Sequence, residues 1–280
     1  MTRIVSAGLI TDAVKHLFIK ANTSLRPDML RGLKNARKNE TKEKPRYALG
    51  AIIKNAFIAK KKMLAICQDT GMAVVYLKAG QSLIVKGDLK KAVAKGVALA
   101  YKEGYFRSSV VSDPLIRKNT NTNLPPIIYT DIAPGNKMNI KVVAKGFGCE
   151  NVSKIKMFRP TDPVSNIEDF IVDAMKEAGS RPCPPVYIGI GIGGTLDKAV
   201  SLSREAIFRP LGKNSKDKYI AKLEKSVLKK VNALGIGPVG VGGKTTALGV
   251  SILTYPTHIA GLPVAVNISC HATRTAEITI

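Results

Sequence analysis

Residues 185–207 read PVYIGIGIGGTLDKAVSLSREAI, in which an apolar run enters a cluster of glycines and a segment with helical spacing of apolar residues follows. This pattern predicts a strand over 185–194 and a helix over 195–207. A strand, a glycine turn and a helix in this order are typical of α/β proteins.

Further helices are indicated on both sides of this stretch. Apolar residues at helical spacing predict helices over 46–62, 88–104, 165–179 and 216–233. Asp88 and Ser165 are the expected N-caps of two of them, and glycines at 104 and 179 are the expected ends.

The predicted strands lie between these helices. MLAICQDTG (63–71) and MAVVYLKAG (72–80) indicate two short strands around a QDTG turn, and 127–148 contains two alternating runs joined by a Pro-Gly-Asn turn, which predicts a β-hairpin. Residues 248–274 indicate two more strands around Pro-Thr-His. We therefore expect one α/β domain over residues 1–280, with a mixed β-sheet flanked by helices and β-hairpins.

The composition is strongly basic. The chain has 44 Lys and Arg against 20 Asp and Glu, a formal net charge of +24. Such a charge attracts nucleic acid, anionic small molecules or an acidic partner subunit. Lys-rich helical segments such as 215–230 are equally typical of a solvated face or of a thermophile, so the charge alone leaves these explanations open.

No apolar run approaches the roughly 18 residues of a membrane span. Asp12, Lys15 and His16 interrupt the N-terminal segment before a signal-like apolar core can form. We expect a cytoplasmic protein that makes no membrane contact, and we interpret His16 as a structural residue of a helix.

The four cysteines, Cys67, Cys149, Cys183 and Cys270, are too sparse for a disulfide scaffold and form no CxxC pair. They are either buried thiols or ligands gathered by the fold. Cys67 precedes Gln68-Asp69, Cys183 lies between prolines, Cys270 precedes His271 and Cys149 follows glycines, so each is next to groups suited to a site. These surroundings do not choose three ligands from four.

Two glycine-rich segments resemble nucleotide-binding motifs without satisfying them. GIGIGG (189–194) matches GxGxxG, but the acidic residue expected about 20 positions later has no counterpart, because Asp217 opens a helix. GPVGVGGKT (237–245) is one residue too long for a P-loop. Two interpretations of these glycines remain: an anion site at a helix N-terminus, or close packing of the backbone.

Three further side chains could take part in chemistry. His258 and His271 are either acid–base groups or satisfied polar residues. Arg107 could bind a carboxylate through its two-pronged guanidinium, or it could be an ordinary surface arginine.

Together, five segments closely resemble the α subunit, or N-terminal domain, of the class I iron–sulfur hydro-lyases, which comprise class I fumarases and L(+)-tartrate dehydratase. The segments are ICQDTG, SVVSDPLIRKNT, VYIGIGIGGTLDKA, GIGPVGVGGKTTALGV and YPTHIAGLPVAVNISCHATR. The resemblance covers roughly residues 5–275, and these motifs are long and specific.

The resemblance implies a [4Fe-4S] cluster held by Cys67, Cys183 and Cys270, with one iron open to substrate, and it leaves Cys149 as a non-ligand. It also implies a substrate pocket lined by Gln68, Asp69, Arg107, Gly148 and His258, in which Asp69 and His258 are the acid–base candidates. An open iron acts as a Lewis acid on a carboxylate and hydroxyl, which suits elimination of water.

The implied function is the reversible addition of water to a C4 dicarboxylate, most simply as fumarate hydratase, with L(+)-tartrate dehydratase as the alternative. The chain lacks the C-terminal domain of full-length class I fumarases, which predicts a separate β subunit. A basic nucleic-acid-binding protein is the alternative from another class, although only 5% of the residues are aromatic and no binding module is recognisable. A glycine-loop nucleotide binder is a third.

Overall fold

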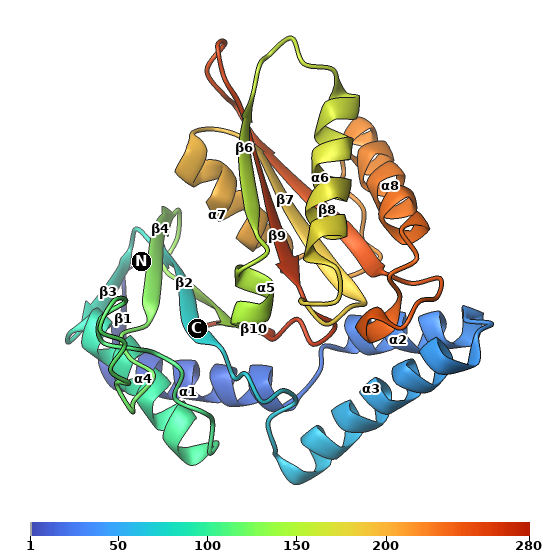
Figure 1. Ribbon diagram of the computed structural model, residues 1–280. Coiled ribbons are helices and arrows are strands. Elements are labelled where there is room, and N and C mark those ends of the chain that lie inside the picture. The colour runs from blue at the N-terminus through green and yellow to red at the C-terminus, as the bar shows by residue number, and fades with distance from the viewer. Residues whose placement is uncertain (1) are drawn as a thin grey trace. The chain divides into compact units, whose positions relative to one another are not determined.

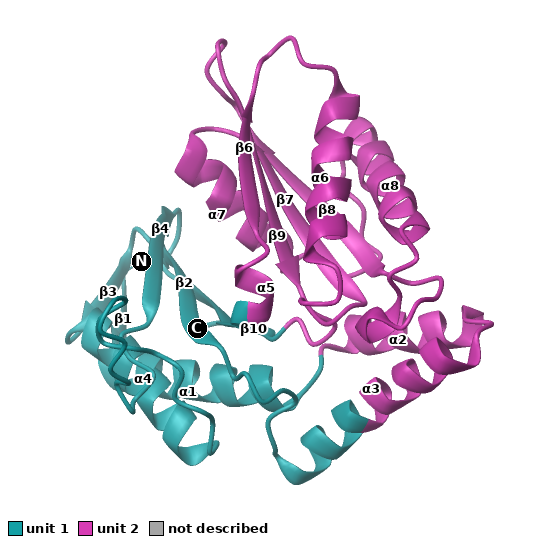
Figure 2. Cartoon of the chain, in the orientation of Figure 1, with its two compact units in different colours: residues 1–25, 55–147, 274–280 teal, residues 26–54, 148–273 magenta. Residues whose placement is uncertain are grey.

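The computed structural model describes residues 2–280 (Figure 1). The chain divides into two compact units (Figure 2). Unit 1 contains residues 1–25, 55–147 and 274–280, and unit 2 contains residues 26–54 and 148–273. Two helices, α3 (Glu43–Lys62) and α5 (Phe147–Glu150), contain residues of both units.

Unit 1 is built on a mixed sheet with strand order β10-β5-β2-β4. Strand β2 pairs in parallel with β4 and antiparallel with β5, and β10 pairs antiparallel with β5. Strands β1 and β3 form a separate parallel pair. The elements of unit 1 are β1 (Arg3–Ser6), α1 (Ala7–Thr23), β2 (Met72–Gly80), β3 (Leu83–Lys86), α4 (Leu89–Glu103), β4 (Ile127–Ala133), β5 (Met138–Lys145) and β10 (Thr275–Thr279).

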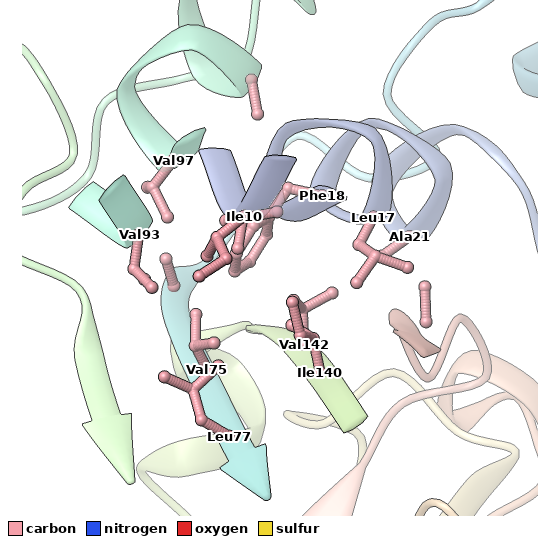
Figure 3. Packing of buried hydrophobic residues seen from close by; sticks show 14 of the residues in the cluster. Ile10, Leu17, Phe18, Ala21, Val75, Leu77, Val93, Val97, Ile140 and Val142 are labelled. Carbon is pink, nitrogen blue, oxygen red and sulfur yellow. The ribbon is translucent and has the colours of Figure 1, made fainter. Parts of the chain in front are cut away.

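The core of unit 1 lies between this sheet and helices α1 and α4 (Figure 3). Alternate residues of β2 and β5, such as Val75, Leu77, Ile140 and Val142, point to the helices, as the period of two in a strand requires. Helix α1 presents an apolar stripe that includes Phe18, which is fully buried.

Unit 2 is built on a second mixed sheet, with strand order β6-β9-β7-β8. Strand β7 pairs in parallel with β8 and antiparallel with β9. The elements of unit 2 are α2 (Pro27–Asn39), β6 (Lys154–Phe158), α6 (Val164–Ala178), β7 (Val186–Gly193), α7 (Leu196–Ala206), α8 (Lys218–Ala233), the 3₁₀ turn Pro238–Gly240, β8 (Ala247–Tyr255) and β9 (Leu262–Ser269).

The two faces of β7 explain its unusual sequence. Ile188 and Ile190 belong to the core that also contains α6 and α8. On the other face, a Cβ at Gly189 would lie 2.2 Å from the Ser203 carbonyl oxygen, and one at Gly191 would lie 2.0 Å from that of Ala199. Helix α7 therefore packs directly on the strand backbone, and these glycines of the GxGxxG match serve close packing.

The predicted mixed α/β fold class is confirmed, and so are the helices and strand around residues 185–207, but the described strands form two four-stranded mixed sheets and a parallel pair, not the single sheet expected. Asp88 caps α4 through the Lys91 N–H, and Asp217 caps α8. Among residues 2–280, no helix combines the length and apolar character needed to cross a membrane.

Three local predictions are wrong. The hairpin over 127–148 does not form, because β2 lies between β4 and β5 and pairs with both. No strand forms over 63–71, because the N–H and carbonyl of Ile66 bond to the Asn22 carbonyl and the Asn55 side chain. Helix α6 begins one residue before Ser165, with Pro163 at its N-cap.

Candidate active site

The segment 66–71 is an irregular loop of unit 1 that joins α3 to β2. The Ile66 N–H donates to the Asn22 carbonyl oxygen at 2.8 Å, and the Asn55 amide donates to the Ile66 carbonyl oxygen at 2.8 Å. These contacts fix the loop where it leaves α3. Cys67 is then half-buried and Gln68 is exposed.

The Asp69 carboxylate is held in one orientation. Its Oδ1 accepts from the Gly71 N–H at 2.9 Å, and its Oδ2 accepts from the Phe147 N–H at 2.8 Å. The buried guanidinium of Arg274 donates to the Asp69 carbonyl oxygen. A Cβ at Gly146 would lie 2.8 Å from Nη2 of Arg274 and 3.1 Å from Oδ2 of Asp69. Gly146 therefore allows the arginine and the carboxylate to approach the same backbone.

The structure brings Arg107 to this loop through its backbone. The Thr70 hydroxyl donates to the Arg107 carbonyl oxygen at 2.8 Å, while the Arg107 side chain is exposed. Cys67, Gln68, Asp69 and Arg107 thus lie on two connected segments of unit 1. An exposed guanidinium is suited to bind a carboxylate of a small molecule.

In unit 2, the structure brings together the segments that carry Cys183 and Cys270. Cys183 is exposed in the loop before β7, and Cys270 is half-buried directly after β9. The His271 Nδ1 lies 2.9 Å from the Cys183 carbonyl oxygen. Because a carbonyl can only accept, His271 carries a proton on Nδ1 and joins the two loops.

Cys149 and Gly148 lie against the same loop. The Cys149 thiol is buried, and its Sγ lies 3.6 Å from the Pro182 carbonyl oxygen, to which it donates. A Cβ at Gly148 would lie 3.1 Å from the Arg181 carbonyl oxygen, so a side chain there would crowd the loop. Cys149 therefore differs from Cys183 and Cys270 in burial.

His258 lies elsewhere in unit 2, in the exposed turn that joins β8 to β9 (Figure 1). Its Nδ1 accepts from the Ala260 N–H at 3.2 Å, so the neutral ring carries its proton on Nε2. The register pairs Tyr187 with Ser269 at one end of β7 and Gly193 with Tyr255 at the other. His258 is therefore separated from Cys183 and Cys270 by the length of β7, roughly 20–25 Å.

The second glycine-rich segment, 237–245, encloses a carboxylate of the chain itself. Glu40 accepts from the backbone N–H of Lys244 at 2.7 Å and from those of Thr41 and Lys42. A Cβ at Gly243 would lie 2.6 Å from Glu40 Oε2. Burial opposes ionisation, but the three N–H groups lower the pKa of Glu40 below its usual value. Close packing against Glu40 accounts for Gly243.

Comparison with known proteins decides the family. The family model described as fumarate hydratase (Fumerase) matches residues 11–279. The chain belongs to this fumarate hydratase family. It is also 40% identical over 274 residues to a protein of Methanocaldococcus jannaschii, provisionally named L(+)-tartrate dehydratase subunit alpha, which covers 95% of this chain and 96% of the relative. The L(+)-tartrate dehydratase subunit alpha of Escherichia coli strain K12 is 27% identical over 274 residues, 97% of this chain and 90% of the relative.

Membership of the fumarate hydratase family confirms the resemblance inferred from the motifs and the enzyme class, a hydro-lyase. It favours the hydro-lyase over the nucleic-acid-binding alternative. Among residues 2–280, no group of three or more His, Cys, Asp or Glu side chains gathers as the ligands of a single metal ion would.

Four buried side chains that hold the 66–71 loop and its neighbours were not predicted from the sequence: Thr70, Tyr101, Asn123 and Arg274. The Tyr101 hydroxyl shares its proton between the carbonyl oxygens of Thr70 and Gly71, at 2.8 and 2.9 Å. Burial raises the pKa of Tyr101, so it remains a donor at neutral pH. Thr70 and Arg274 lie inside the motifs CQDTG and CHATR, but their partners are backbone carbonyls that no motif reveals.

Proposed function

We propose that the chain is the α subunit of a two-subunit iron–sulfur hydro-lyase that adds water reversibly to a C4 dicarboxylate, with fumarate as substrate and malate as product. The observation that carries this proposal is the 66–71 loop. In a chain of this family, it places a cysteine beside a carboxylate fixed by two N–H groups, with an exposed arginine on the adjoining segment.

Cys67, Cys183 and Cys270 are the proposed cluster ligands. Their donor chemistry fits, because thiolates hold [4Fe-4S] clusters and all three side chains are at least partly exposed on loops. The His271 contact supports the pairing of Cys183 with Cys270 in one site. Cys149 is not a proposed ligand, since its buried thiol donates a hydrogen bond to the Pro182 carbonyl oxygen. When bound, the cluster would supply a Lewis-acidic iron for the substrate carboxylate and hydroxyl.

The other site residues have roles that follow from their surroundings. Arg107 and Gln68, both exposed, bind the carboxylates of the substrate. Asp69 takes the carbon-bound proton or returns it, because its carboxylate is half-buried and held in one orientation. Gly148 leaves the surface beside the Cys183 loop bare for substrate.

His258 is the second proposed acid–base group. Its Nδ1 accepts from the Ala260 N–H, and its Nε2 carries the proton that the reaction would use. Since the length of β7 separates it from Cys183 and Cys270 in one copy of unit 2, it can join them only from a second copy of the chain. A two-fold dimer, in which each copy gives the same residue to the other, meets this requirement.

A partner subunit is the remaining component. The relatives are named subunit alpha of L(+)-tartrate dehydratase, which supports a β subunit that completes the substrate contacts. The same names favour L(+)-tartrate dehydratase as a second candidate function. The net charge of +24 suits attraction of a dianionic substrate or of an acidic partner.

Anaerobic turnover tests this proposal. The cluster-loaded chain should hydrate fumarate when its β subunit is present and show no turnover alone, because the substrate contacts that the β subunit supplies are then missing. Fumarate and L(+)-tartrate should be assayed side by side, and a higher kcat/KM for tartrate would establish the second candidate. Absence of turnover on both substrates by the loaded two-subunit complex would contradict the proposed function, and robust turnover by the α chain alone would contradict the two-subunit arrangement.

A further inference from the structure

Two buried polar side chains in unit 1 connect the 69–71 backbone to the 107–109 backbone. Thr70 is 1% exposed, and its hydroxyl donates to the Arg107 carbonyl oxygen at 2.8 Å. Asn123 is 0% exposed, and its amide donates to the Gly71 carbonyl oxygen at 3.2 Å. The Asn123 Oδ1 accepts from the Ser109 N–H at 2.9 Å. The two segments are therefore joined directly after Asp69 on one side, and at Arg107 and two residues after it on the other.

These bonds connect segments that are distant in sequence and belong to no common sheet. Residues 66–71 and 105–110 form no strand, so no ladder of main-chain bonds holds them together. Removing the partner of a buried polar group costs more free energy than the hydrogen bond itself contributes, because water cannot reach the group to replace the partner. Asn123 also has a φ of 58°, a left-handed conformation that asparagine tolerates better than most residues.

We propose that Thr70 and Asn123 are positioning residues for substrate binding. They hold the Arg107 segment at a fixed distance from Asp69, so that the guanidinium that binds a substrate carboxylate and the group that moves the proton act on one molecule. The inference rests on the proposed function, and it deepens that function, because neither residue touches substrate. Both act through main-chain carbonyls and N–H groups.

This role predicts a particular change in kinetics. Arg107 binds the carboxylate equally in the bound state and in the transition state, so loosening its segment weakens uniform binding. In the loaded two-subunit enzyme, Thr70→Val keeps the side-chain volume and removes the donor. We expect KM for fumarate to rise roughly tenfold, while kcat stays within about threefold of wild type.

Two variants serve as matched comparisons. Thr70→Ser keeps the hydroxyl and should restore KM to within about twofold of wild type. Thr11→Val removes a buried hydroxyl of unit 1 that bonds to the Ala7 and Ala92 carbonyls, far from the loop in sequence, and should leave KM unchanged. Should Thr70→Val fail to fold, Asn123→Gly replaces it, because glycine accepts the positive φ and removes both bonds.

Amide hydrogen exchange of the chain gives a readout that does not depend on turnover. Thr70→Val and Asn123→Gly should increase exchange across residues 107–112, whereas Thr70→Ser and Thr11→Val should not. If the wild-type enzyme is active, and both Thr70→Val and Asn123→Gly have the wild-type KM and the wild-type rate of amide exchange, the inference is overturned. Equal losses of iron and kcat without a KM change would also overturn it, since they indicate a purely structural role. Wild-type enzyme that turns over neither dicarboxylate would instead refute the proposed function.

Discussion

Replacement of Cys67, Cys183 or Cys270 by serine should remove the iron–sulfur cluster from the chain, and with it all turnover. Serine keeps the size of the side chain but offers a hydroxyl that stays protonated at neutral pH, whereas a thiol ionises easily and thiolates are the ligands of such clusters. Iron and sulfide content after anaerobic reconstitution measures the effect directly. We expect each of the three variants to retain only a small fraction of the wild-type iron.

Cys149→Ser is the matched control for this series. The Cys149 thiol donates to the Pro182 carbonyl oxygen, and a serine hydroxyl can make the same bond. This variant should bind wild-type amounts of iron and remain active. Equal iron content in all four variants would show that the ligand set is wrong. Thermal melting of the iron-free chains separates loss of a ligand from loss of the fold.

Asp69→Asn should have the second-largest effect: the cluster stays bound while kcat falls by roughly 10²–10⁴-fold, the usual contribution of a general acid–base group. An amide cannot take up the substrate proton. It also has one acceptor oxygen for the two N–H groups, from Gly71 and Phe147, that the carboxylate now satisfies. Steady-state kinetics and iron analysis of the same preparation measure both results.

Glu40→Gln controls for the loss of an acceptor oxygen. Both oxygens of the Glu40 carboxylate accept backbone N–H groups, Oε1 from Thr41 and Lys42 and Oε2 from Lys244, but Glu40 has no proposed role in the reaction. Its kcat should stay at the wild-type value. A near-normal kcat for Asp69→Asn would remove Asp69 from the mechanism.

Mixing inactive chains tests whether His258 acts from a second copy. Asp69→Asn and His258→Asn chains should each be inactive, but in a mixed two-fold dimer one site combines the intact Asp69 of one chain with the intact His258 of the other. Random mixing then restores up to about a quarter of wild-type turnover. If no activity returns although mixed dimers form, His258 does not act in this way.

Helices were predictable because their signals are local. The Asp88 cap and Gly104 end of α4, and the Asp217 cap of α8, lie within a few residues of the elements they define. The hairpin expected over 127–148 failed for the opposite reason. Its two runs do become β4 and β5, but the choice of partner depends on β2, which precedes them in sequence and lies between them in the sheet.

In the candidate site, too, local features could be predicted from the sequence and contacts between distant segments could not. Cys67, Gln68, Asp69 and Arg107 stand in recognisable motifs, so the sequence could indicate them. The polar support of the loop could not be read from the sequence, because Thr70 and Asn123 act on carbonyl and N–H groups brought near only by folding. The distance of His258 from Cys183 likewise follows from the order of β7, β8 and β9 in the sheet.

The iron and sulfide content of the anaerobically purified wild-type chain tests directly whether the chain holds an iron–sulfur cluster. We predict a brown protein with about four irons and four sulfides per chain, as ligation of one [4Fe-4S] cluster requires. The colour and iron should be lost on exposure to oxygen and regained by anaerobic reconstitution. A colourless chain that takes up no iron and sulfide under reconstitution, although it is folded, would contradict the assignment of an iron–sulfur hydro-lyase.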